Sequence, residues 1–320
     1  MTALSKLLLG TAALAVALSA APARAEFALD PRFTDSDGDM VADIPTDASQ
    51  LVDPDTLVFA YTPVEDPAIY ADVWAEFIEH LSEATGKDVQ FFPVQSNAAQ
   101  LEAMRAGRLH IAGVNTGGNP LAVACAGFRP FAMMAANDGS YGYEMEIIAH
   151  PEAGIEEVAD LAGKTVAFTS ETSNSGFKAP SALLASQFDL TAGEDFESAF
   201  SGAHDNSILG VANRDYDAAA IANSVKGRMI ERGVVSEDDL KVIYTSDTFP
   251  TTGYGVVHNL TPELQQQIQD AFFSFDWEGT GLAEEFGPQG EEQFIPITFQ
   301  ENWGVIREID AAMNVSYDCN

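Results

Sequence analysis

The amino-acid sequence predicts a two-lobed α/β protein in which each lobe has a mainly parallel sheet with flanking helices. Short apolar strands alternate with helices in two separate series, a pattern typical of parallel sheets. The chain of 320 residues is long enough for two domains. One strand and several helices near the C-terminus have no sheet of their own. We expect them to return to the first lobe, which gives two crossings and a hinge between the lobes.

The first series of strands and helices begins after residue 55. In its leading helix, apolar side chains recur at helical spacing from Ile69 to Leu81, and Gly86 ends the pattern. We therefore assign this series to lobe I. The predicted strands are 56–62, 88–94 and 109–114, and the predicted helices are 68–84 and 98–106.

The second series forms lobe II, which we place at residues 148–248. Lobe I then comprises residues 56–147 and 249–320, because the strand at 253–258 and the helices through residue 312 return to it. The predicted strands of lobe II are 164–168, 216–221 and 240–245, and its predicted helices are 175–188, 205–212 and 224–232.

The first 25 residues have the pattern of a secretory signal peptide. Lys6 supplies a positive charge, residues 7–21 are apolar, and Ala23-Arg24-Ala25 is a cleavage signal, so we expect the mature chain to start at Glu26. A retained N-terminal anchor is the alternative. No later segment offers the roughly 18 uncharged residues that a membrane span needs, so we expect export without membrane insertion.

The chain is strongly acidic, with a formal net charge of -34. Removal of residues 1–25 takes away Lys6 and Arg24 and no acid, so 13 basic and 49 acidic residues remain and the charge becomes -36. A field of this sign repels nucleic acid and anionic lipid, so neither is an expected partner. It does not exclude an anionic ligand, because salt screens distant charges beyond about 8 to 10 Å.

The sequence contains two cysteines, Cys125 and Cys319. In an oxidising compartment this pair can form one disulfide that ties the C-terminus to the body of the protein. The alternative is a free thiol that binds a soft ligand, although no cluster of cysteines and histidines supports it.

Residues 26–55 form an acidic N-terminal extension without hydrophobic periodicity. Within it, carboxylates stand at every second residue, a spacing by which a loop wraps oxygen ligands round calcium. The loop departs from the EF-hand pattern and is closer to the Asp-rich loops of thrombospondin-type repeats. A solvated acidic loop is the alternative to a structural Ca2+ site. The candidate ligands are Asp35, Asp37, Asp39, Val41 and Asp43.

A hydroxyl-rich turn follows the strand at 164–168 and leads into a helix. Free backbone N–H groups and the positive end of the helix dipole stabilise a tetrahedral anion at such a place, and Ser173 and Ser175 add hydroxyl donors. A plain helix cap is the alternative interpretation. Both can hold at once, because they use different donors.

Two further segments are candidates for the same site. The glycine-rich loop at 113–120 follows the third strand of lobe I, and its glycines let the backbone approach a ligand. His204 stands just before a helix, where its imidazole can bind an oxyanion oxygen while Asp205 fixes its tautomer. A surface histidine beside a capping Asp205 is the alternative.

The sequence shows no catalytic signature. Zinc-protease, nucleophile-elbow, phosphate-loop and dinucleotide motifs are missing, and the five histidines are scattered. The sequence therefore favours a binding protein over an enzyme and requires no cofactor besides the candidate calcium. A structural calcium-binding surface protein is a third alternative.

Six short motifs occur together: Ala84-Thr-Gly-Lys-Asp-Val, Leu101-Glu-Ala-Met-Arg-Ala-Gly, Asp160-Leu-Ala-Gly-Lys-Thr-Val, Ser173-Asn-Ser-Gly-Phe, Gly202-Ala-His-Asp and Asp217-Ala-Ala-Ala-Ile. In this combination residues 56–260 resemble the phosphonate, phosphite and phosphate binding proteins of ABC importers. The resemblance implies a type II periplasmic binding protein fold, a periplasmic location, an ABC transporter permease as partner and no enzymatic activity. We also expect a monomer.

The resemblance also implies roles for individual residues. The serine-rich turn would cradle the phosphorus oxygens, His204 would join it, and Tyr141 is the nearest aromatic candidate at the lobe crossing. Thr116 and Tyr61 stand at strand ends, where the topology places them against the ligand. The expected ligand-binding residues are Ser173, Asn174, Ser175, His204, Tyr141, Thr116, Asn223 and Tyr61.

One departure from the family pattern bears on the ligand. Members that bind an aminoalkylphosphonate place an acidic side chain where this sequence has Asn223, and Thr251 and Thr252 bring no acid either. Because Asn223 cannot neutralise an ammonium, we expect phosphite, phosphate or a simple phosphonate. The alternatives are an aminoalkylphosphonate-binding protein and an oxyanion-sensing receptor of the same fold, for example one for arsenite.

Overall fold

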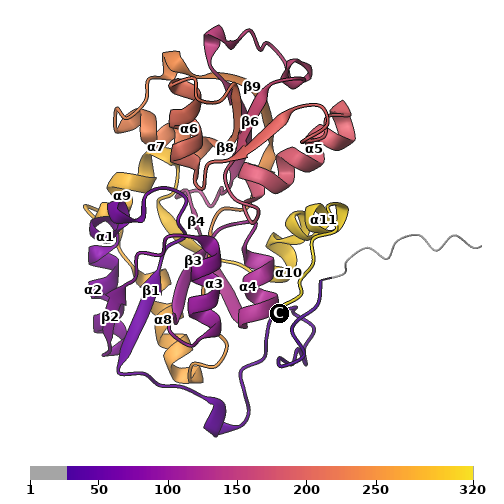
Figure 1. Cartoon of the computed structure of the whole chain (residues 1–320). Coiled ribbons are helices and arrows are strands. Elements are labelled where there is room, and N and C mark those ends of the chain that lie inside the picture. Colours follow the sequence, from indigo (N-terminus) through magenta and orange to yellow (C-terminus); the bar gives the residue numbers. More distant parts are fainter. Residues whose placement is uncertain (1–26, 320) are drawn as a thin grey trace, which may run out of the picture.

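The computed structural model describes residues 27–319. Two β-sheets, each flanked by helices, divide the molecule into two lobes (Figure 1). We use lobe I for the six-stranded sheet with its helices and lobe II for the five-stranded sheet with its helices. The predicted signal peptide and its cleavage site lie outside the described residues.

The sheet of lobe I has the strand order β11-β4-β10-β3-β1-β2. β1 pairs in parallel with β2 and β3, whereas β10 lies antiparallel between β3 and β4. β11 adds an antiparallel edge strand. The strands are β1 (Thr56–Ala60), β2 (Asp88–Phe91), β3 (Ile111–Val114), β4 (Phe128–Ala135), β10 (Gly253–Val257) and β11 (Gln293–Pro296).

The helices of lobe I begin and end at residues with clear local causes. Ser96 caps α3 by accepting a hydrogen bond from the Ala99 N–H, and Gly86 ends α2 in the left-handed conformation that glycine adopts most readily. The helices are α1 (Tyr70–Val73), α2 (Ala75–Thr85), α3 (Asn97–Arg105), α4 (Asn119–Ala126), α8 (Pro262–Ser274), α9 (Gly281–Phe286), α10 (Phe299–Asn302) and α11 (Gly304–Ala312).

The sheet of lobe II has the strand order β7-β6-β8-β5-β9. β6 pairs in parallel with β7 and β8, and β5 lies antiparallel between β8 and β9. The strands are β5 (Tyr143–Ala149), β6 (Thr165–Phe168), β7 (Glu197–Phe200), β8 (Ala218–Ala222) and β9 (Lys241–Phe249), and the helices are α5 (Ala179–Phe188), α6 (His204–Ala212) and α7 (Asn223–Glu231).

Both sheets are mixed, although most of their strands point the same way. β10 and β11 run against the other four strands of lobe I, and β5 runs against the other four of lobe II. The two α/β lobes are as predicted. β4, β5, β7 and β11 were not predicted from the sequence; β4 is buried along nearly its whole length and shows no alternation of apolar and polar residues.

The chain crosses between the lobes through residues 136–142, from β4 to β5, and through residues 250–252, from β9 to β10. The parallel strands β1, β3, β6 and β8 end near these crossings (Figure 1). Residues that follow these strands line one cavity between the lobes. The exact lobe boundaries stay a prediction. The arrangement places a site where parallel strands end, as is general for α/β sheets.

An aromatic cluster fills the core of lobe I beneath this edge. Trp74 lies 4.7 Å from the Phe59 ring and 5.6 Å from the Tyr254 ring, measured between centroids. Phe294 packs against the same group, 5.2 Å from Tyr254. Burial of each such side chain contributes roughly 1.5–3 kcal/mol, so this cluster holds the first-lobe strands in a rigid frame.

The N-terminal extension lies over lobe I. The Asp30 N–H donates to the Ala124 carbonyl, and Val52 bridges Leu260. Phe27 packs on Phe299 and also on Tyr317 of the C-terminal segment. The two ends of the described chain therefore meet on one side of lobe I.

A disulfide joins Cys125 in α4 to Cys319, the two cysteines for which a bond is expected. Their Cα atoms are 5.2 Å apart, although 194 residues separate them in the chain. Closing so long a loop removes conformational freedom from the unfolded chain.

Reduction of this disulfide is expected to lower the free energy of unfolding by about 2–4 kcal/mol. Urea unfolding with and without dithiothreitol measures the change. The double variant Cys125→Ser, Cys319→Ser serves as the control, because reductant should leave its midpoint where it is. An unchanged midpoint on reduction of the native chain would contradict the prediction.

Candidate functional site

A small cavity lies between the lobes, lined by residues from both. It has a volume of about 50 Å³ open to the centres of water molecules. One water needs roughly 10–15 Å³ on this measure, so the space suits a few waters or one small ion. The lining residues are Tyr61, Val64, Asn115, Thr116, Tyr143, Ser173, Asn174, Ser175, His204, Ala222, Ser224, Val225, Arg228, Thr251, Thr252 and Glu291.

The serine-rich turn forms the lobe II side of the cavity. Residues Asn174–Lys178 make one π-helical turn that continues into α5. The Ser173 hydroxyl accepts a hydrogen bond from the Gly176 N–H, so it caps the turn. In the described chain no acceptor faces the N–H groups of Asn174 and Ser175, which begin the turn. Capping and free donors coexist here, as the sequence analysis allowed.

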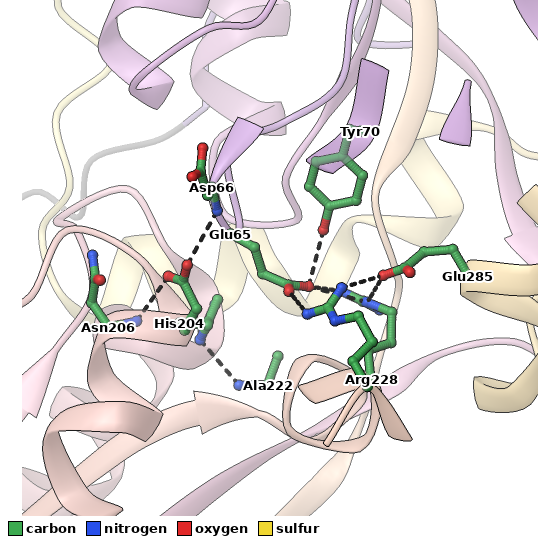
Figure 2. A network of polar contacts seen from close by, with 10 residues as sticks. Glu65, Asp66, Tyr70, His204, Asn206, Ala222, Arg228 and Glu285 are labelled. Carbon is green, nitrogen blue, oxygen red and sulfur yellow. Dashed lines mark hydrogen bonds and ion pairs between the residues drawn. The ribbon is translucent and has the colours of Figure 1, made fainter. Parts of the chain in front are cut away.

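His204 begins α6 and lines the cavity with a neutral imidazole. Its Nδ1 accepts a hydrogen bond from the Ala222 N–H at 3.2 Å, so the proton is on Nε2 (Figure 2). Burial lowers the pKa of His204 to about 4. The Nε2–H is therefore a neutral donor at physiological pH, and the protonated imidazole considered from the sequence is disfavoured.

The predicted role of Asp205 is wrong. Its carboxylate accepts hydrogen bonds from the Asp66 N–H at 3.2 Å and from the Asn206 N–H, and it does not hold the imidazole (Figure 2). The tautomer of His204 is set by the backbone of β8 instead, because α6 packs directly against that strand. Asp205 joins lobe II to lobe I.

Lobe I contributes hydroxyl groups and a phenol. Thr116 lines the cavity, but its hydroxyl donates to the Pro250 carbonyl at 2.8 Å. Thr251 lies beside it, and its buried hydroxyl has no partner among the described residues. Tyr61 completes this side, as its position at the end of β1 predicts. A buried hydroxyl without a partner is costly, so Thr251 is a candidate ligand contact.

Tyr141 is not in the cavity, and its predicted role is wrong. Its side chain is exposed and its hydroxyl accepts a hydrogen bond from Asn302. Tyr143, two residues further, lines the cavity and accepts a hydrogen bond from Asn174 Nδ2 at 3.2 Å. Gly142 lies between the two tyrosines with φ at +119°, so the chain turns there and the side chains take different directions.

Asn223 also lies outside the cavity lining, which corrects its predicted role. It is the first residue of α7, and its amide pairs with Glu144 of the neighbouring strand β5. Ala222 and Ser224 on either side face the cavity instead. Successive residues of a helix differ in direction by about 100°, so one position along the chain decides which residue meets the ligand.

Two charged residues that were not predicted from the sequence, Arg228 and Glu291, also line the cavity. Arg228 is 3% exposed and donates two hydrogen bonds to Glu65 Oε1, at 2.9 and 3.1 Å. Glu65 follows β1, whereas Arg228 belongs to α7, so this ion pair joins the two lobes (Figure 2). No motif marks it, because its partners are 163 residues apart.

The ion pair is part of a larger buried network. Tyr70 donates to Glu65 at 3.0 Å (Figure 2). Arg232 also contacts Glu65 and Glu285. Burial alone would raise the pKa of Glu65, but Arg228 and Arg232 outweigh it and hold the pKa below its ordinary value. Glu65 is thus ionised at neutral pH, and in the closed conformation it balances the positive charge of Arg228.

Contacts on the other side of the cavity also join the lobes. Lys178, beside the serine-rich turn, forms a buried ion pair with Asp310 at 2.7 Å and donates to the Gly117 carbonyl at 2.8 Å. A Cβ atom at Gly117 would collide with the backbone of Thr172 and Asn174. The lobes therefore meet on both sides of the cavity, and the conformation is closed.

The Asp-rich loop of the extension brings together three of its predicted calcium ligands. One carboxylate oxygen each of Asp35, Asp37 and Asp39 lies within 4.8 Å of the others. Asp43 is not in this group, because its carboxylate accepts hydrogen bonds from Ser36. Val41 is buried under the loop. Calcium binding at this loop stays a prediction.

The two lobes and the enclosed cavity define a solute-binding protein that closes round a small ligand. Residues 59–303 match the family model described as "ABC transporter, phosphonate, periplasmic substrate-binding protein". The match covers most of the chain, so the protein belongs to this family of transporter components and is not an enzyme. Within residues 27–319, no helix has the length and apolarity to cross a bilayer.

Two relatives place the chain more closely. It is 29% identical over 272 residues to the "Phosphate-import protein PhnD" of Mycolicibacterium smegmatis, which covers 81% of this chain and 83% of the relative. It is 26% identical over 206 residues to the "Phosphonates-binding periplasmic protein" of Escherichia coli, with 63% and 61% covered. Both alignments support membership in the family.

Solved structures confirm the type II periplasmic binding protein fold. A binding protein component of an ABC phosphonate transporter from Pseudomonas aeruginosa superposes with a TM-score of 0.73 at 22% identity, covering 81% of this chain and 86% of the other. PhnD1 from Prochlorococcus marinus, in complex with methylphosphonate, superposes with a TM-score of 0.72 at 16% identity, covering 82% and 99%. At these identities the likeness concerns the fold alone.

The two tyrosines at the crossing offer a matched test of the site. Tyr143→Phe removes the hydroxyl that holds Asn174 and should weaken anion binding about fivefold, since a net hydrogen bond contributes about 1 kcal/mol. Tyr141→Phe should leave affinity unchanged. Isothermal titration with phosphate and methylphosphonate compares the two variants, and equal losses would contradict this assignment of the cavity.

Calcium binding has its own test. If the Asp-rich loop holds Ca2+, millimolar calcium raises the melting temperature of the native chain and EDTA reverses the rise. The variant Asp35→Asn, Asp37→Asn removes two carboxylates and should abolish the effect. If calcium does not change the melting temperature, the loop is a solvated acidic loop and not a Ca2+ site.

Proposed function

We propose that the protein captures a small phosphorus oxyanion, namely phosphate, phosphite or a simple phosphonate, in the periplasm and delivers it to an ABC transporter permease. The observation that carries this proposal is the set of neutral donors in the cavity. The free N–H groups of Asn174 and Ser175 start a helical turn, His204 offers Nε2–H, and Thr251 offers an unpartnered hydroxyl. Such donors suit a tetrahedral oxyanion.

The size of the cavity supports a small ligand. About 50 Å³ for water centres is enough for a few waters, and the contacts on both sides of the cavity leave little space for a long substituent. The names of the relatives agree with this class: one is a phosphate-import protein, and one neighbour binds methylphosphonate.

Capture proceeds by closure of the lobes. The anion first binds the serine-rich turn of lobe II, and lobe I then closes with Tyr61, Thr116 and Thr251. Closure expels water and brings Glu65 against Arg228, so the occupied state has a shape that a permease can recognise. We propose a monomer for this cycle, because the site is complete within one chain.

Two alternatives of the same fold remain open to test. An aminoalkylphosphonate-binding protein needs room and an acid for the amine. An oxyanion-sensing receptor for arsenite, as considered from the sequence, depends on a thiol at Cys125, but Cys125 is bonded to Cys319 and does not line the cavity.

A thermal-shift and titration panel tests the proposal. Phosphate, phosphite and methylphosphonate should raise the melting temperature and bind one to one, whereas 2-aminoethylphosphonate and arsenite should bind weakly or not at all. Ser175→Ala and His204→Ala should each weaken binding about tenfold, because each removes a buried donor to a charged oxygen. Ser186→Ala, on the exposed part of α5, is the control. Failure of every phosphorus oxyanion to bind would overturn the proposal.

A further inference from the structure

Glu291 stands apart from the other residues of the cavity. It lies in lobe I between the turn at Gly287–Gln289 and β11, far along the chain from every motif of the site. It is the one carboxyl among the lining residues, all of which belong to the described chain. Within that part of the chain, its side chain makes no hydrogen bond or ion pair. A carboxyl group therefore lines a cavity whose other polar groups are mainly hydrogen-bond donors suited to an oxyanion.

The charges around Glu291 are already balanced. Arg228 of α7 faces it, but that guanidinium is bonded to Glu65 and lies within 3.3 Å of Glu285. Tyr61 at the end of β1 and Tyr254 of β10 are buried phenols, and burial raises the pKa of both, so they stay neutral. His204 of α6 is neutral as well. In the closed conformation a bound anion therefore meets no unpaired cation and one carboxyl among the lining residues.

A bare carboxylate and a fully deprotonated anion repel each other in so small a cavity. One proton between them turns this repulsion into a charge-assisted hydrogen bond. The proton is obtainable near neutral pH, because burial raises the pKa of Glu291 to about 7, even though Arg228 lowers it. The proton can come from the ligand or from the carboxyl.

We propose that Glu291 and the bound oxyanion share one proton, so that Glu291 selects ligands by their protonation state. The inference deepens the proposed function and rests on it. Hydrogen phosphate brings its own proton and donates it to the Glu291 carboxylate. Sulfate brings none, so Glu291 must take a proton from solvent and then donate it to a sulfate oxygen. The site therefore favours phosphate over sulfate more strongly as the pH rises.

The other chemical role for an acid here is to pair with the ammonium of an aminoalkyl tail. The structure favours the shared proton, because the cavity is small and the lobes meet on both sides of it, which leaves little space for an aminoalkyl tail. The two roles predict different results for the same variant.

The experiment is isothermal titration of the mature chain with phosphate and with sulfate from pH 6 to pH 8.5. Sulfate binding needs protonated Glu291, so its affinity should fall about thirtyfold over this range. Phosphate affinity should not fall, because hydrogen phosphate and the ionised carboxylate both become more abundant as the pH rises. Titrations in two buffers of different ionisation heat count protons. At pH 8.5 we expect uptake of about one proton with sulfate and almost none with hydrogen phosphate.

Glu291→Gln keeps the size and offers an N–H donor at every pH. In this variant the affinity for sulfate should lose its pH dependence, and sulfate should bind at pH 8.5. Glu292→Gln, one residue along and outside the cavity lining, should behave like the native chain.

The outcomes separate the two proposals. If no phosphorus oxyanion binds the native chain, the proposed function fails. If phosphate binds but sulfate binding takes up no proton, or Glu291→Gln keeps the native pH dependence, the role of Glu291 is overturned. A variant that loses only its affinity for 2-aminoethylphosphonate would overturn it as well, in favour of an amine contact. The proton count uses the native chain, so it decides the matter even if the variant folds poorly.

Discussion

A buried arginine needs its carboxylate partners, and this requirement governs how the two lobes meet. Arg228 on α7 is held by Glu65, which follows β1, and by Glu285 on α9. Burying the charges costs about as much as their attraction returns, so the network adds little net stability. Its effect is alignment: Arg228 pairs with both carboxylates when α7 lies beside the segment after β1 and beside α9, and in this position Ser224 and Val225 of α7 line the cavity.

The same rule explains the neutral character of the cavity. On one side Glu65 neutralises Arg228, and on the other Asp310 neutralises Lys178. Arg228 and Lys178 therefore hold the two lobes together and do not bind the anion. The anion is left to dipoles, which are the N–H groups of the serine-rich turn, the His204 Nε2–H and the Thr251 hydroxyl. An acidic protein can bind an anion in this way, because such donors act at contact distance and the surface charges are screened.

The sequence located the parts of the site that local structure determines. Ser173–Ser175, Thr116 and Tyr61 each follow a strand that the hydrophobic pattern reveals, and a strand end in an α/β sheet points into the cleft. The direction in which a single side chain points was harder to predict from the sequence. Tyr141 and Tyr143 differ because Gly142 turns the chain between them, and a left-handed turn cannot be read from apolar periodicity.

Residues that meet only through tertiary structure had no signal in the sequence. Asn223 stands at the position where the family pattern suggests a ligand contact, yet its side chain is taken by Glu144 from β5, a strand that the sequence analysis did not predict. The absence of an acid at that position therefore said nothing about acids in the cavity. Glu291 reaches the cavity from a loop before an edge strand, because β11 extends the lobe I sheet beside β4. The lobe I side of the cavity therefore owes its carboxyl group to the C-terminal part of the chain, which adds β11 to the lobe I sheet. The motifs of lobe II do not determine this side.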